Sequence, residues 1–121
     1  MRFEGIYTPV VMPHRPDHSI DRDRFAEVLE FLIGAGVHGL VIAGTTGEYY
    51  AQTPEERIEM MHLAGKIIAG RLPMGVGTGA IRTEDSIMYA EAAKAAGADA
   101  LIETAQSFGL NTDIEFDVPT A

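Results

Sequence analysis

The chain has 121 residues and a formal net charge of −9, and its hydrophobic and charged fractions of 46% and 22% exclude a disordered or low-complexity chain. The acidic charge argues against nucleic-acid binding and against adhesion to an anionic membrane surface. With no cysteine there is no disulfide, thiolate metal site or thiol nucleophile. No apolar run reaches the roughly 20 residues that a membrane helix needs, so we expect a cytoplasmic, single-core protein.

Strands and helices are predicted to alternate from the start of the chain. Residues 5–12 are mostly apolar and β-favouring, which predicts a first strand. Asp21 can cap the helix that follows, and the glycines at 34 and 36 can end it. Residues 40–43 form a short apolar run between glycines, as in a strand buried on both faces. The apolar stripe of the intervening helix comprises Phe25, Val28, Leu29, Leu32 and Ile33.

The second half of the pattern repeats this alternation. Thr53, followed by Pro54 and then Glu56, is a strong signal for the start of a second helix. Residues 72–77 are predicted to form a third strand, and Thr83 to cap a third helix. A fourth strand is predicted over residues 98–103.

The order of elements implies parallel strands joined by right-handed crossovers. Two α/β architectures fit: a small doubly wound sheet, or a half-barrel of four parallel strands and three crossover helices from a TIM (β/α)8 barrel, which needs about 250 residues when complete. Residues 1–104 carry the pattern. Residues 105–121 are expected to be an irregular or altered tail, with 114–118 as a possible short strand.

The segment Gly-Thr-Thr-Gly-Glu at residues 44–48 follows the second predicted strand. Ligands in parallel α/β folds bind at this end of the strands. Glycines allow close approach of the backbone, and two hydroxyls with backbone N–H groups can bind a carboxylate or phosphate. The alternative is a turn whose threonines and glycines serve only the backbone.

Structural roles are predicted for the other polar or glycine-rich groups. The Gly-x-Gly-x-Gly run at residues 75–79 is interpreted as a strand-end turn. His14 and His18 are assigned to a solvated loop, and residues 55–57 to charges at a helix start. No metal and no cofactor is predicted.

Five short motifs follow one another along the chain: Thr-Pro at 8–9, Gly-Thr-Thr-Gly-Glu at 44–48, Gly-Thr-Gly-Ala at 77–80, Thr-Glu-Asp-Ser at 83–86 and Gly-Ala-Asp-Ala-Leu at 97–101. In order and spacing they resemble the dihydrodipicolinate synthase / N-acetylneuraminate lyase family of Schiff-base aldolases. The resemblance covers residues 3–104 and implies the partial barrel rather than the doubly wound sheet.

The resemblance also implies a chemistry and a set of site residues. In that family a lysine amine attacks the ketone of pyruvate or a related 2-oxo acid, and the Schiff base acts as an electron sink. The paired threonines of the loop hold the substrate carboxylate, a role that falls on Thr45 and Thr46. The supporting residues are expected to be Thr8, Gly44, Gly47 and Glu48, and the possible substrate contacts Tyr49 and Tyr50, since residues 49–52 are similar to members acting on keto-deoxy sugar acids.

The chain departs from the family at the nucleophile. The family's lysine lies on the sixth strand, whereas the two lysines here, Lys66 and Lys94, are predicted on the solvent side of helices. Phe116 stands where the family's proton-relaying tyrosine is expected. No catalytic residue is therefore assigned in this chain.

Three hypotheses remain. The first is the amino-terminal half of a synthase, lyase or dehydratase acting on a 2-oxo acid, dependent on a missing half-barrel. The second is a non-catalytic half-barrel that forms a homo-oligomer. The third is a small anion-binding protein.

Overall fold

A computed structural model describes residues 3–102 of the chain. Within this range, no helix has the length and apolarity to cross a membrane. The predicted tail and Phe116 lie outside the described residues. The elements, in order, are β1 (Tyr7–Pro9), α1 (Arg22–Gly34), β2 (Gly39–Ile42), the short 3-10 helices η1 (Thr45–Gly47) and η2 (Tyr49–Ala51), α2 (Pro54–Ile68), β3 (Met74–Gly77), α3 (Thr83–Ala95) and β4 (Ala100–Ile102).

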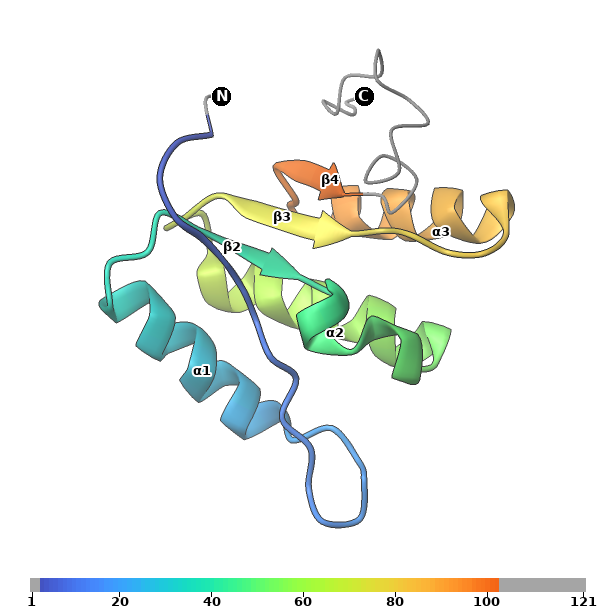
Figure 1. The fold of residues 1–121 in the computed structure, drawn as a ribbon, viewed down its shortest axis with the longest axis horizontal. Coiled ribbons are helices and arrows are strands. Elements are labelled where there is room, and N and C mark those ends of the chain that lie inside the picture. Colours follow the sequence, from blue (N-terminus) through green and yellow to red (C-terminus); the bar gives the residue numbers. More distant parts are fainter. Residues whose placement is uncertain (1–2, 103–121) are drawn as a thin grey trace.

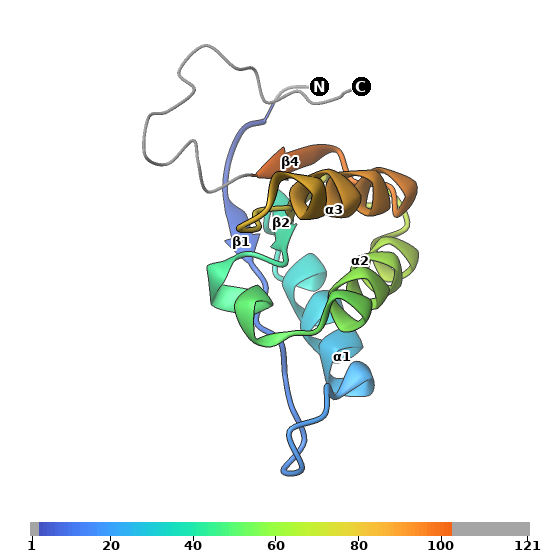
Figure 2. The ribbon, with the colours of Figure 1, turned by 90° about the vertical axis from the view of Figure 1, so that its right-hand side faces the viewer.

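The four strands form one parallel sheet in the order β1-β2-β3-β4 (Figure 1). All three α-helices lie on the same side of this sheet (Figure 2). A doubly wound sheet would carry helices on both faces. The arrangement is therefore that of part of a (β/α) barrel, in which helices cover only the outer face. The predicted partial barrel is confirmed.

The helix starts are determined by local chemistry, and two of the three predicted caps are confirmed. The Asp21 carboxylate accepts a hydrogen bond from the backbone N–H of Arg24 at 3.0 Å. Thr53 and Glu56 form a reciprocal capping box, with Pro54 opening α2. A side-chain cap of this kind stabilises a helix by about 1 kcal/mol.

The prediction that Thr83 caps α3 is wrong. Arg82 is the N-cap residue and makes no side-chain capping bond, while Thr83 is already helical. The first turn instead carries Glu84 and Asp85, whose charges favour the positive end of the helix. Glu84 also accepts a 3.0 Å hydrogen bond from the Arg82 guanidinium.

The first strand is shorter than the predicted 5–12, because its chain leaves the sheet after Pro9. The Val10 N–H still donates to the Val41 carbonyl at 3.0 Å. Val10 and Met12 are then buried in the core, at 1% and 5% exposure, rather than paired as a strand. The strands β3 and β4 likewise begin two residues later than expected, at Met74 and Ala100.

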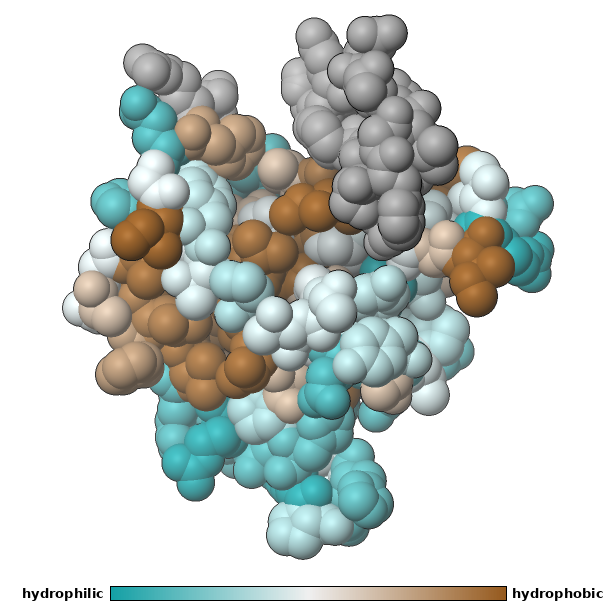
Figure 3. Space-filling view, viewed as in Figure 1, coloured by the Kyte–Doolittle hydropathy of each residue, from teal (hydrophilic) through white to brown (hydrophobic). Residues whose placement is uncertain are grey.

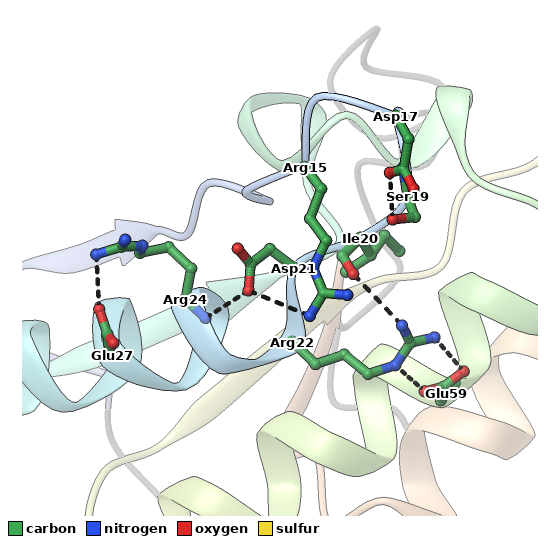
Figure 4. Close-up of polar contacts among 9 residues, drawn as sticks. All are labelled: Arg15, Asp17, Ser19, Ile20, Asp21, Arg22, Arg24, Glu27 and Glu59. Carbon is green, nitrogen blue, oxygen red and sulfur yellow. Dashed lines mark hydrogen bonds and ion pairs between the residues drawn. The ribbon is translucent and has the colours of Figure 1, made fainter.

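The loop between β1 and α1 is held by its own polar contacts (Figure 4). The Asp17 carboxylate accepts hydrogen bonds from the Ser19 hydroxyl at 2.6 Å and from the Ser19 N–H at 3.0 Å. These bonds hold the pKa of Asp17 below its usual value. Just beyond the loop, the Arg22 guanidinium pairs with the Glu59 carboxylate, which joins the start of α1 to α2.

The helices cover one face of the sheet and leave the other face without helices. Side chains such as Leu40 and Val76 point toward the helices and are fully buried. The opposite face is called here the open face, and apolar side chains gather over it (Figure 3). It bears a shallow apolar groove of about 380 Å³. The groove is lined by Phe3, Tyr7, Val41, Gly75, Ala100, Leu101 and Ile102.

We expect the open face to drive self-association of the 121-residue chain, because exposed apolar surface of this kind favours contact with other apolar surface. Phe3→Glu places a charge at the rim of the groove and is expected to weaken association in sedimentation velocity. Phe31→Glu makes the same charge change on the exposed surface of α1, where Phe31 is 72% exposed, and serves as the matched control. A wild-type chain that stays monomeric at every concentration would contradict this expectation.

The C-terminus of α2 offers a test of backbone strain. Ala69 caps this helix in the left-handed conformation, with a φ of 48°. Glycine adopts this conformation without a Cβ penalty, so Ala69→Gly is expected to raise the free energy of unfolding by about 0.5–1 kcal/mol. Ala95→Gly, in the right-handed last turn of α3, is expected to lower it by a similar amount. Chemical unfolding of both variants measures the two signs.

Candidate functional site at the carboxyl ends of the strands

The predicted binding loop lies directly after β2, at the rim formed by the carboxyl ends of the parallel strands. Two residues at its ends are left-handed: Ala43, just before it, with a φ of 59°, and Glu48, its last residue, with a φ of 55°. Within the loop, the Gly47 N–H donates to the Gly44 carbonyl and the Glu48 N–H to the Thr45 carbonyl, both at 3.0 Å. The backbone therefore turns back on itself and leaves the two threonines exposed.

Glycine contacts bring this loop against the ends of its neighbouring strands. A Cβ added to Gly47 would lie 2.8 Å from the Val10 carbonyl oxygen, in the chain just after β1. A Cβ on Gly77, at the end of β3, would collide with the Ala43 carbonyl. The backbone therefore approaches closely on both sides of the loop, which explains why these two positions need glycine.

The predicted site residues separate into two locations. Residues 44–48 lie together in the loop, with Thr45, Thr46 and Glu48 exposed and Gly47 buried. Thr8 instead pairs with Leu40 in the β1–β2 register, and Leu40 is buried against the helices. Because residues in register share a face, Thr8 belongs to the helix-covered layer rather than to the open face.

The two tyrosines after the loop belong to η2. Tyr50 is 65% exposed, whereas Tyr49 is half-buried, and their rings meet edge to face at 5.7 Å. Gln52, at the end of η2, donates from its Nε2 to the Gly47 carbonyl at 3.0 Å. Its side chain thereby ties the end of the loop to the start of α2.

Arg57 lies at the start of α2, where the sequence places it, but its burial and its partners were not predicted. Although it belongs to the charged start of α2, its side chain is only 4% exposed. Its Nη1 donates to the Gly79 carbonyl at 3.0 Å and its Nη2 to the Gly77 carbonyl at 2.8 Å. One signal was available: Arg57 occupies a position three, four and seven residues before Met60, Met61 and Ala64, which form the buried face of α2.

Two aromatic rings enclose the Arg57 guanidinium. Its Cζ lies 4.5 Å from the centre of the Tyr49 ring and 3.9 Å from that of Tyr89. Cation–π contacts of desolvated groups are worth about 2 kcal/mol. Burial lowers the pKa of Arg57, with Tyr89 and Tyr49 opposing that shift. Arginine stays protonated under these conditions, so a positive charge is fixed behind the loop.

No carboxylate among the described residues forms an ion pair with Arg57, and its buried Nε has no hydrogen-bond partner within that same part of the chain. A cleft of about 480 Å³ opens beside it. The cleft is lined by Tyr49, Tyr50, Gln52, Pro54, Arg57, Gly79, Ala80, Ile81, Asp85 and Tyr89.

The lysines lie away from this rim. Lys66 is in the last turn of α2 and Lys94 in the last turn of α3, and both are exposed, as predicted. The helices return the chain to the amino ends of the next strands, so both lysines lie at the end of the sheet opposite the loop. Among residues 3–102, no three His, Asp or Glu side chains are grouped as metal ligands.

A parallel sheet covered on one face, with a polar loop at its carboxyl rim, defines the class: part of a (β/α) barrel, a fold that places its active sites at that rim. The chain belongs to the Dihydrodipicolinate synthetase family, whose sequence model matches residues 2–105. The resemblance inferred from the five motifs is thereby confirmed.

Individual relatives support this membership. A 4-hydroxy-tetrahydrodipicolinate synthase of Desulfotalea psychrophila is 38% identical over 104 residues, which are 86% of this chain and 35% of that protein. A protein named probable 2-dehydro-3-deoxy-D-pentonate aldolase of Escherichia coli is 35% identical over 101 residues, 84% of this chain and 34% of its own length. The chain therefore spans about a third of the length of the relatives that it matches.

Solved structures agree with the fold. The dihydrodipicolinate synthase of Bacillus clausii superposes with a TM-score of 0.79 at 33% identity, over 82% of this chain and 33% of that one. A prophage protein of the dihydrodipicolinic acid synthase family from Escherichia coli, solved in complex with pyruvate, gives a TM-score of 0.80 at 33% identity. That match covers 84% of this chain and 34% of the other.

The tight contact at Gly47 yields a matched pair of variants. Gly47→Ala forces a methyl group against the Val10 carbonyl and is expected to lower the free energy of unfolding by about 1–3 kcal/mol. A Cβ on Gly44 meets only the Val41 side chain, at 3.6 Å, so Gly44→Ala is expected to stay within about 0.5 kcal/mol of wild type. Equal effects in denaturant unfolding would contradict the close packing of the loop.

Proposed function

We propose that this chain carries the carboxylate-binding part of a Schiff-base lyase that acts on pyruvate or a related 2-oxo acid. The observation that carries the proposal is the position of the Gly-Thr-Thr-Gly-Glu loop. It lies at the carboxyl rim of a sheet in a member of this family, with Thr45 and Thr46 exposed. The match to a family structure solved in complex with pyruvate supports this substrate class.

The chemistry of the loop suits a carboxylate. Two hydroxyls can donate to its oxygens, and the first N–H groups of a helical turn have no helical partners. Glu48 leaves the loop in a left-handed conformation and is exposed, so its charge is solvated rather than buried against the ligand. In this proposal Gly44 and Gly47 shape the backbone, and Tyr49 and Tyr50 are substrate contacts. Thr8 supports only the strand that leads to the loop, since it pairs with Leu40.

The nucleophile is supplied from outside these 121 residues. A Schiff-base lysine needs a desolvated position next to the substrate ketone, which lowers its pKa. Lys66 and Lys94 are both exposed at the opposite end of the sheet. The 121-residue chain alone is therefore proposed to bind the 2-oxo acid in the cytoplasm without turning it over, and further strands complete the barrel and the catalysis.

A second candidate function is a non-catalytic, self-associating half-barrel that binds an anion at the same loop. The open face favours it, because its apolar groove has no cover from residues 3–102. The coding DNA beyond the codon for Ala121 separates the two. A further lysine-bearing strand supports the lyase, and its absence from all three reading frames supports the second candidate.

The isolated chain is expected to bind pyruvate but not to form a covalent bond with it. Pyruvate should shift the amide NMR signals of Thr45 and Thr46 in a saturable manner. Thr45→Val or Thr46→Val should weaken this binding by about tenfold, the loss of one hydrogen bond to a charged group. Borohydride added with pyruvate should leave the mass of the chain unchanged.

Thr83→Val is the control for the loss of a hydroxyl, since Thr83 is exposed in the first turn of α3 and should bind pyruvate as wild type does. An adduct on Lys66 or Lys94 would contradict the external nucleophile. Shifts that are absent, or that survive both valine substitutions, would contradict the carboxylate site.

A further inference from the structure

One buried side chain joins the segments that follow β2 and β3. Arg57 projects from the first turn of α2 and is 4% exposed. It contacts η2 through the Tyr49 ring and α3 through the Tyr89 ring. Its two terminal nitrogens bind the carbonyls of Gly77 and Gly79 at 2.8 and 3.0 Å. The planar guanidinium can bond both carbonyls while it stacks between two rings, whereas a lysine ammonium has no flat face to stack.

These contacts reach the binding loop from two sides. Tyr49 follows Glu48 directly, so its ring fixes the exit of the loop. Gly77 packs against Ala43, which enters the loop. A shift of Gly77 would therefore move the entry of the loop, and a shift of Tyr49 would move its exit.

We propose that Arg57 is a positioning residue of the 2-oxo acid site: its buried guanidinium clamps the end of β3 to η2 and thereby holds Thr45 and Thr46 in the conformation that binds a carboxylate. The inference rests on the proposed function for its ligand, but the clamp itself is a property of the backbone. Its action depends on the planar fork of arginine and on the flanking rings, not on positive charge alone.

Arg57→Lys tests this distinction, because lysine keeps the charge and loses the fork. Amide hydrogen exchange is measured first, without ligand, on the 121-residue chain. Exchange at Gly47 and Glu48, whose N–H groups close the loop, should rise by about tenfold, the loss of one charge-assisted hydrogen bond. Exchange at Ala69, which bonds to Gly65 at the far end of α2, should not change.

Arg71→Lys is the matched control. Arg71 also donates to backbone carbonyls of α2, those of Ile67 and Ile68, and to Glu30, but at the opposite end of that helix. This variant should leave the exchange of the loop as in wild type. Tyr89→Leu removes one wall of the clamp and should loosen the loop in the same direction as Arg57→Lys.

Pyruvate titration of the same variants gives the second measurement. Arg57→Lys and Tyr89→Leu should weaken binding by about tenfold, in step with the faster exchange of the loop. Arg71→Lys should bind pyruvate as wild type does. If Arg57→Lys does not fold, hydrogen exchange and pyruvate titration of Tyr89→Leu test the proposal instead.

Several outcomes overturn the proposal. Wild-type exchange at Gly47 and Glu48 in both loosening variants would show that the clamp does not hold the loop. Retained pyruvate affinity in Arg57→Lys would show that charge suffices. A uniform rise in exchange over the whole chain would reduce Arg57 to a general stability role. Absence of any pyruvate shift in wild type would refute the proposed function alone, since the exchange comparison needs no ligand.

Discussion

The parallel pairing of four successive strands is the constraint on which the rest of the structure depends. Each crossover must return the chain to the same end of the sheet with the same hand, so α1, α2 and α3 all cover one face. The carboxyl ends of the strands then meet at one rim. The loop after β2 and the turn after β3 become neighbours there, with Gly77 packed against Ala43.

The same constraint buries backbone carbonyls at the end of β3, and Arg57 supplies their hydrogen-bond donors. Strand β3 ends in a buried run of glycine and threonine, and the carbonyls of Gly77 and Gly79 need donors there. A buried cation is costly to desolvate, yet each hydrogen bond to a charged group returns about 1.5–3 kcal/mol and the rings of Tyr49 and Tyr89 add to this. An apolar side chain would avoid the desolvation cost, but it would leave both buried carbonyls without a hydrogen-bond donor.

The sequence predicted features that depend on residues close together in the chain and missed those that depend on residues far apart. Asp21 and Thr53 were recognised as caps because their partners lie three residues away. The loop at 44–48 was placed correctly because it follows a continuous apolar strand. Arg57 was missed because the carbonyls it binds are 20 and 22 residues distant, so the charge pattern of its own helix start misled the prediction.

The end of β1 was predicted wrongly for a different reason, since tertiary packing overrode local preference there. The apolar residues after Pro9 suit a strand equally well whether they pair or pack, and only the assembled core shows that Val10 and Met12 pack. The open face could be anticipated only once a partial barrel was inferred, because strand sequences alone do not reveal which face the helices cover.

The geometry also separates two tasks that a Schiff-base enzyme must combine. Helices in this fold run back toward the amino ends of the strands, so the last turns of α2 and α3 carry Lys66 and Lys94 away from the loop. Bond formation requires the amine and the ketone to approach to about 3–3.5 Å. A carboxylate held by Thr45 and Thr46 leaves its ketone at the opposite end of the sheet from both amines. In the proposed function, the described residues can therefore fix the substrate's orientation, and the strand that completes the barrel must bring the nucleophile to it.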